Sequence, residues 1–335
     1  MASDRVTLRR RILGLQAYVW RWLAAIGFYF HQRPNPSPPK PNFIRYCSTR
    51  RTENSPPASL RLAFYVPNDY TSEVRRGATY PVVLNFHGGG FTMGTVTDDV
   101  RWAAMVVDGV NAVVVSAEYR LAPEHPFPTA VDDGLAVILW LGSNASDLGI
   151  DPERLALTGF SAGGNMCFTV PLRLYEQLQS QSCVHASGKI IVPHVKAIVA
   201  WYPGIDYRIS RAERRATCVR PRKTLPVVLT KLFDQSYLPD SACNTSPFVS
   251  PAAATDEMLD DALPSSILLY LCEWDMLQRE GADFTERLIG LEKDARCVTI
   301  KERIHAFDKS PWPFKLDPKI TQFYEDGCRF LKTVL

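Results

Sequence analysis

The stretch LALTGFSAGGNM at residues 155–166 decides how this chain folds, because small residues there join an apolar strand-like run to a helical pattern. Gly159, Ser161 and Gly163 form a Gly-x-Ser-x-Gly pattern at the junction. A serine on a sharp strand-to-helix turn is pushed out of the sheet, and only small flanking residues leave room for that turn. Glycine and serine also populate ordinary turns, so the pattern alone leaves Ser161 as either a nucleophile or a turn residue.

Apolar runs of strand length alternate with longer helical patterns on both sides of this turn. The predicted strands are residues 60–66, 81–86, 112–119, 154–160, 195–203, 265–272 and 296–302; the predicted helices are residues 97–109, 127–143, 162–180, 277–293 and 317–334. Several of the strands are apolar on both faces, which is typical of buried parallel strands. The alternation therefore predicts a doubly wound α/β sheet.

The 335-residue chain divides into two segments. Residues 1–58 contain an apolar stretch and a proline-rich link, and residues 59–335 carry the α/β pattern. Within the second segment the alternation breaks from about residue 207 to residue 255, where the chain is basic and then proline-containing. An insertion placed over the carboxyl ends of the strands would form a cap.

The apolar stretch at residues 12–30 has two interpretations. Gln16 and Arg21 interrupt it, whereas a membrane-spanning helix needs about 20 mostly uncharged residues. We therefore expect a helix packed on the protein, with a helix that contacts or anchors to a membrane as the alternative. The expected location is the cytoplasm, and the alternative is association with a membrane through this helix.

Composition excludes several classes of partner. Hydrophobic residues make up 46% of the chain and charged residues 22%, and the net charge of +3 is spread along it, so nucleic acid is not an expected partner. The eight cysteines form no CxxC pair, which favours free thiols over a disulfide framework or a metal site. No cofactor is expected, and the oligomeric state is left open.

The glycine-rich HGGGF at residues 87–91 follows the predicted strand 81–86. Consecutive glycines let backbone N–H groups approach a reacting carbonyl, so Gly88 and Gly89, with the N–H of Ala162, are the predicted oxyanion hole. The alternatives are a flexible loop or a phosphate cradle, but the Gly-Lys-Ser/Thr ending of a phosphate loop is absent.

A serine nucleophile needs a base and an acid at the ends of later strands. Of six histidines, only His305 follows the last predicted strand, in RIHAF. Asp275 in CEWDML follows strand 265–272 and is the predicted acid, with Glu273 as its close competitor; Asp308 lies too near the histidine in sequence. The predicted triad is therefore Ser161, Asp275 and His305.

Taken together, these motifs resemble the hormone-sensitive-lipase-like family of α/β-hydrolases. The resemblance rests on HGGGF, EYRLAPEHPFPTAVDD at 118–133, GFSAGGN at 159–165, YPGID at 202–206, WDML at 274–277 and IHAF at 304–307, in the order of the family. It implies an eight-stranded, mostly parallel sheet flanked by helices, and a helical cap built partly from the N-terminal segment. It also implies a cofactor-free, carboxylesterase-like serine hydrolase that acts on a small-molecule ester.

Two positions depart from the family pattern. Phe160 stands where the family usually has an acidic residue, and Met276 where it commonly has the proline of Asp-Pro-Leu. Neither change removes a group that acyl transfer uses directly. Phe160 replaces a carboxylate that could orient nearby backbone, so we expect it to affect the positioning of the site and the substrate range.

The function expected from these residues is hydrolysis of a small to medium apolar ester through an acyl-enzyme. The alternatives are an acyltransferase or cyclase that uses the same site, and a non-catalytic ligand receptor on the same fold. The chain also loosely resembles hydrolases of fungal biosynthetic pathways, which suggests a role in secondary-metabolite biosynthesis.

Overall fold

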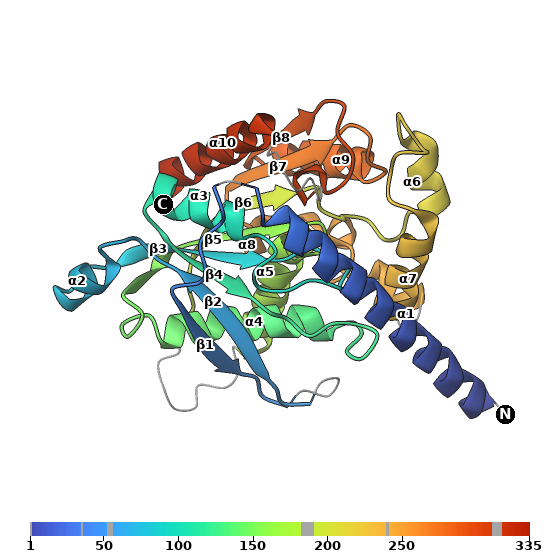
Figure 1. Ribbon diagram of the computed structural model, residues 1–335, viewed down its shortest axis with the longest axis horizontal. Helices are drawn as coiled ribbons and strands as arrows, with labels where there is room; N and C mark the ends of the chain where they lie inside the picture. Colours follow the sequence, from blue (N-terminus) through green and yellow to red (C-terminus); the bar gives the residue numbers. More distant parts are fainter. Residues whose placement is uncertain (1, 35, 52–55, 182–190, 239–240, 310–316) are drawn as a thin grey trace.

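The computed structural model describes residues 2–34, 36–51, 56–181, 191–238, 241–309 and 317–335 (Figure 1). Its centre is one eight-stranded sheet with the strand order β1-β2-β4-β3-β5-β6-β7-β8. The strands are β1 Phe43–Ser48, β2 Ser59–Tyr65, β3 Tyr80–Phe86, β4 Val113–Ala117, β5 Ile150–Phe160, β6 Val195–Trp201, β7 Ser266–Cys272 and β8 Asp294–Ile300.

Helices connect and cover these strands (Figure 1). The α-helices are α1 Ala2–His31, α2 Tyr70–Arg75, α3 Val100–Val110, α4 Thr129–Ser143, α5 Ala162–Gln181, α6 Arg211–Thr217, α7 Val227–Tyr237, α8 Asp256–Ala262, α9 Gln278–Gly290 and α10 Pro318–Val334. The described residues also form the short 3₁₀ helices η1 Ser241–Thr245, η2 Pro251–Ala253 and η3 Phe307–Lys309.

The pairing confirms the predicted eight-stranded, mostly parallel α/β sheet. β1 and β2 pair antiparallel, β2 pairs antiparallel with β4, and the remaining neighbours are parallel. β1 was absent from the prediction because its six residues are partly exposed at the sheet edge and form no continuous apolar run. The sheet therefore extends into the segment that precedes residue 59.

The core lies on both faces of the sheet because successive side chains of a strand point to opposite sides. In β3, Val82 and Leu84 join a cluster packed under α4, α5 and α9, while Val83 joins a second cluster packed under α3 and α10. Every residue of β3 is buried, as expected of a parallel strand covered on both faces.

The parallel strands bring the predicted site residues to one edge of the sheet. The glycine loop follows β3, Ser161 follows β5, Asp275 follows β7 and His305 follows β8. Because the carboxyl ends of parallel strands share an edge, residues far apart in sequence meet there.

α1 lies across the molecule and contacts α7, and its N-terminal end projects from the body (Figure 1). The Arg21 guanidinium on α1 donates to the Thr92 carbonyl at 2.8 Å and forms an ion pair with Glu124 at 2.7 Å. The helix predicted at residues 12–30 is therefore packed on the protein along one face. Within the part of the chain described above, no helix combines the length and apolarity needed to cross a bilayer.

Candidate active site

Ser161 sits on the sharp turn between β5 and α5. Its φ of 54° lies in the left-handed region, and its N–H donates to the Trp201 carbonyl at 2.8 Å. The flanking residues must be small: a Cβ on Gly159 would lie 2.3 Å from the Gly163 carbonyl oxygen, and one on Gly163 would lie 2.0 Å from that of Phe86. The strained turn points to a nucleophile position rather than to an ordinary turn.

His305 reaches this serine from the loop after β8. Its side chain is buried, and its Nε2 lies 2.8 Å from the Ser161 Oγ. The other ring nitrogen, Nδ1, lies 2.5 Å from the Asp275 Oδ2. A carboxylate at Nδ1 holds the ring hydrogen there and leaves Nε2 free to accept a proton from the serine.

Asp275 is fixed by hydrogen bonds to its second oxygen. The Leu277 N–H donates to the Asp275 Oδ1 at 3.2 Å, and the Thr224 hydroxyl donates to it at 3.4 Å. The Thr224 hydroxyl also accepts from the Met276 N–H at 2.9 Å. Because these contacts use Oδ1, they orient Oδ2 toward His305.

The competing carboxylates have other partners. The Glu273 side chain accepts from Glu302 N–H at 2.8 Å and from the Lys301 ammonium at 3.0 Å, and these contacts lower its pKa. Asp308 is buried and accepts from the hydroxyls of Tyr202 and Tyr324, each at 2.5 Å. The geometry therefore favours Asp275 over both alternatives.

The glycine loop lies against the serine turn. A Cβ on Gly88 would lie 3.0 Å from the Phe160 carbonyl oxygen and 3.5 Å from the Ser161 Cβ, so only glycine fits there without displacement. Gly89 has a φ of 115°, which side chains rarely adopt. Within the described residues, the N–H groups of Gly88, Gly89 and Ala162 donate no backbone hydrogen bond. These three groups are thus available to an oxyanion.

Two hollows meet at Ser161. The larger is a cavity of about 240 Å³ lined by His305 and mostly by apolar groups, among them Phe28 of α1 and Leu229 and Phe233 of α7. The smaller has about 20 Å³ and is lined by Ala162, Leu277 and Tyr237, with the Arg211–Asp234 ion pair in its wall. His305 lines the large cavity but not the small one.

Phe160, the departure from the family pattern, faces a lysine. The Lys309 ammonium lies 3.8 Å from the centroid of the Phe160 ring, and it forms ion pairs with Asp99 at 2.8 Å and Asp308 at 3.1 Å. Burial alone would lower the pKa of Lys309, but the two carboxylates outweigh burial and raise it. Two carboxylates thus already balance this lysine without an acidic residue at position 160.

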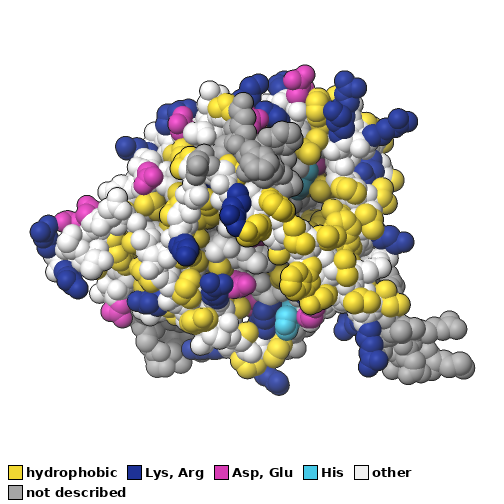
Figure 2. All heavy atoms as spheres, in the orientation of Figure 1, with side chains coloured by type: hydrophobic (Ala, Val, Ile, Leu, Met, Phe, Trp, Pro, Cys, Tyr) yellow, Lys and Arg dark blue, Asp and Glu magenta, His cyan; other side chains and the backbone are white. Residues whose placement is uncertain are grey.

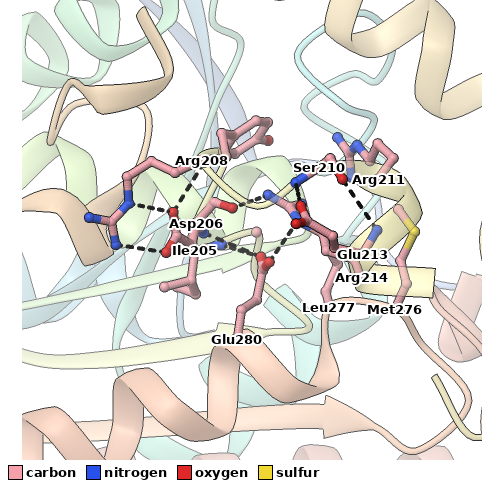
Figure 3. A network of polar contacts seen from close by, with 12 residues as sticks. Ile205, Asp206, Arg208, Ser210, Arg211, Glu213, Arg214, Met276, Leu277 and Glu280 are labelled. Carbon is pink, nitrogen blue, oxygen red and sulfur yellow. Dashed lines mark hydrogen bonds and ion pairs between the residues drawn. The ribbon is translucent and has the colours of Figure 1, made fainter. Parts of the chain in front are cut away.

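The first part of the segment 207–255, predicted as the cap insertion, contacts α9 close to Met276 and Leu277 (Figure 3). Arg214 of α6 forms an ion pair with Glu280 of α9 at 2.9 Å, and both side chains are buried. Glu280 also accepts from the Ile205 N–H at 2.7 Å. Glu280 lies in the first turn of α9, so this ion pair ties α6 to the helix that follows the Asp275 loop.

Thr224 is a site residue that sequence reasoning missed, since it lies 51 positions from Asp275 in a segment without a recognisable pattern. The charges around Phe160 were missed for the same reason. In the described part of the chain, no group of histidine, cysteine and acidic residues could hold a metal ion. Seven cysteines are free thiols there, and Cys183 lies outside the described residues.

Known proteins resemble this chain in sequence and in fold. A family model described as alpha/beta hydrolase fold matches residues 83–309. Carboxylesterase NlhH from Mycobacterium tuberculosis is 49% identical over 86 residues, which are 26% of this chain and 27% of that protein. An arylesterase from Saccharolobus solfataricus is 28% identical over 232 residues, which are 69% of each chain.

A solved structure of a Pyrobaculum calidifontis esterase matches the fold with a TM-score of 0.74 at 24% identity, covering 96% of this chain and 92% of that one. The strand order, the serine turn and these matches agree with the prediction made from the hormone-sensitive-lipase-like motifs. The chain belongs to the α/β-hydrolase fold family.

Proposed function

We propose that this protein is a carboxylic ester hydrolase that works through an acyl-enzyme on Ser161. The main observation behind this proposal is a pair of hydrogen bonds that connects Asp275 to His305 and His305 to the Ser161 Oγ. Relatives named carboxylesterase and arylesterase support the same class of reaction. Because all three side chains are present and hydrogen-bonded, we favour an enzyme over a ligand receptor that has lost its catalytic groups.

The reaction has two steps. His305 Nε2 takes the proton of the Ser161 hydroxyl while the Oγ attacks the ester carbonyl, and the alcohol leaves with a proton returned by His305. Asp275 stabilises the imidazolium that forms in between. Water then attacks the acyl-enzyme by the same route and releases the acid.

The developing negative charge lies on the former carbonyl oxygen. The N–H groups of Gly88, Gly89 and Ala162 are the donors that we assign to it, because they lack backbone partners among the described residues. Each well-placed donor of this kind typically contributes about 3 kcal/mol in the transition state. Because Gly88 and Gly89 have no side chains, their N–H groups can approach the carbonyl oxygen of the ester.

The position of His305 orients the substrate. The leaving alcohol must lie beside His305 to receive its proton, and His305 lines the large cavity and not the small one. We therefore assign the alcohol portion to the large apolar cavity and the acyl group to the small hollow. The substrate class that fits is a short acyl ester of a sizeable apolar alcohol.

An acyltransferase or cyclase would use the same three residues and differ only in the nucleophile that attacks the acyl-enzyme. Product analysis distinguishes these alternatives: a hydrolase releases the free acid, whereas an acyltransferase or cyclase forms a new ester, amide or ring. The cytoplasmic location and the contact of residues 12–30 with a membrane stay predictions at this point.

The direct kinetic test compares hydrolysis of p-nitrophenyl acetate by the wild type, Ser161→Ala and a control, Ser143→Ala on the exposed face of α4. We expect Ser161→Ala to lose at least about 10⁴-fold in kcat, and the control to match the wild type. Equal turnover by Ser161→Ala and the wild type would refute the assignment of Ser161 as nucleophile.

A further inference from the structure

The outer face of α1 is apolar and exposed. Of the seventeen exposed large hydrophobic residues in the described chain, nine lie between Ile12 and Phe30, including Leu15 at 67% and Trp22 at 58% exposure. At 3.6 residues per turn these nine occupy an arc of about 140° around the helix. One continuous stripe of α1 therefore faces away from the protein.

The inner face of the same helix belongs to the large cavity. Leu13 and Ala17 are buried against the protein, while Ala24, Gly27 and Phe28 line the cavity beside Ser161. Arg21, tied to Glu124, fixes which side of α1 points inward. The helix thus has an exposed apolar stripe on one side and the candidate active site on the other.

The stripe continues onto the insertion. α7 packs on α1, and Val227 and Val228 at its start are exposed, as is Val219 in the preceding loop. Figure 2 shows hydrophobic side chains gathered over α1 and α7, with lysine and arginine side chains at the margins of the patch. We call the stripe of α1 together with these three valines the apolar platform.

Exposed basic residues adjoin both parts of the apolar platform in the sequence. Arg10 and Arg11 are exposed just before Ile12, and Arg220, Arg222 and Lys223 are exposed between Val219 and Val227. Apolar and aromatic side chains flanked by basic ones are the signature of a helix that lies in the headgroup region of an anionic lipid surface. A second copy of the chain would bring the same positive charges together, which disfavours self-association through this face.

We propose that the apolar platform docks onto an anionic lipid surface, with α1 lying in the plane of the headgroups. Docking requires no chemistry at Ser161 and so does not rest on the proposed hydrolase function. α1 lies on the surface in this arrangement and does not cross it.

Vesicle co-sedimentation of the full chain tests the docking. We expect binding to mixed phosphatidylcholine–phosphatidylserine vesicles, weaker binding to phosphatidylcholine alone, and at least about tenfold weaker binding when Leu15→Ser, Trp22→Ser and Ile26→Ser are combined. The matched control is Tyr46→Ser with Ile289→Ser, which removes exposed hydrophobic side chains from β1 and α9 and should bind like the wild type.

Hydrolysis of soluble p-nitrophenyl acetate by the same variants separates docking from folding and from chemistry. The triple variant should keep wild-type activity, because its three side chains lie outside both hollows. If the wild type binds vesicles without hydrolysing esters, the docking stands and the proposed hydrolase function fails.

A second variant, Arg10→Glu with Arg11→Glu, should reduce the preference for phosphatidylserine, while Arg220, Arg222 and Lys223 retain part of it. The docking proposal is overturned if the wild type fails to bind anionic vesicles, or if the triple variant binds them as tightly as the wild type. It is also overturned if light scattering shows a wild-type dimer that the triple variant breaks while neither protein binds vesicles.

Discussion

The ammonium of Lys309 lies 3.8 Å from the centroid of the ring of Phe160, the residue that precedes Ser161. An ammonium over an aromatic face is attracted by the negative potential of the ring. Asp99 and Asp308 form ion pairs with Lys309. The buried ammonium therefore needs no further carboxylate at position 160. The aromatic residue thereby replaces the acidic residue expected from the family without leaving Lys309 unpaired.

Lys309→Met should destabilise the fold strongly. The substitution leaves the carboxylates of Asp99 and Asp308 buried without their cation, which typically costs about 3–5 kcal/mol. Urea unfolding at neutral pH measures the change. The control is Lys223→Met, which removes an exposed lysine placed 4.3 Å from the Trp274 ring and should cost under about 1 kcal/mol. If both variants lost the same free energy of unfolding, the ion pairs of Lys309 would contribute no more to stability than an exposed lysine does.

Asp98, in the wall of the large cavity, should make stability depend on pH. Burial raises the pKa of Asp98 to about 7, although hydrogen bonds from Thr95 oppose the shift. The folded state therefore binds more protons than the unfolded state from about pH 4 to pH 7, and the unfolding free energy falls as pH rises through that window.

Asp98→Asn removes this dependence. The stability of the variant relative to the wild type should improve by about 1–3 kcal/mol between about pH 5 and pH 8, since one pKa unit is worth about 1.4 kcal/mol. Urea midpoints for both proteins at the two pH values give the difference. A constant gap between them would contradict the raised pKa of Asp98.

Substitutions of Asp275 and Glu273 test which of these two carboxylates is the acid of the triad. Asp275→Asn should lower kcat by about 10⁴-fold, because the amide no longer holds the productive His305 tautomer. Glu273→Gln should leave kcat within a few-fold of the wild type, since its partners are Lys301 and the Glu302 N–H. Steady-state kinetics on p-nitrophenyl acetate compares them, and the reverse ranking would move the acid to Glu273.

The two hollows should respond separately to substitution. Leu277→Ala enlarges the small hollow and should shift preference toward longer acyl chains, while Leu229→Ala enlarges the large cavity and should leave acyl preference unchanged. Values of kcat/KM for p-nitrophenyl acetate, butyrate and octanoate report the shift. A change in acyl preference with Leu229→Ala alone would reverse the proposed orientation of the ester.

Much of this arrangement could be predicted because it depends on local patterns. Gly159 and Gly163 mark the serine turn by their size, and the apolar runs of the parallel strands place Asp275 and His305 at the same edge. β1 escaped prediction because an edge strand alternates only weakly and is half exposed. A short edge strand depends on its partner more than on its own sequence.

The contacts that cross between segments could not be predicted. Thr224 reaches Asp275 from 51 residues away, and Lys309 reaches Phe160 from the loop after β8. Neither residue lies in a motif, and both are polar groups whose position depends on how the insertion and the last loop pack. Side-chain pairing over such distances follows from tertiary structure rather than from periodicity.

The central claim is that His305 activates Ser161 as a nucleophile, and the mass of the intact protein after exposure to a fluorophosphonate tests it most directly. The reagent loses fluoride as the serine oxygen bonds to phosphorus, so we predict one adduct on the wild type, mapped by peptide analysis to Ser161. Ser161→Ala should show no adduct, and His305→Ala should label far more slowly. An adduct at another residue, or equal labelling of Ser161→Ala and the wild type, would contradict the account.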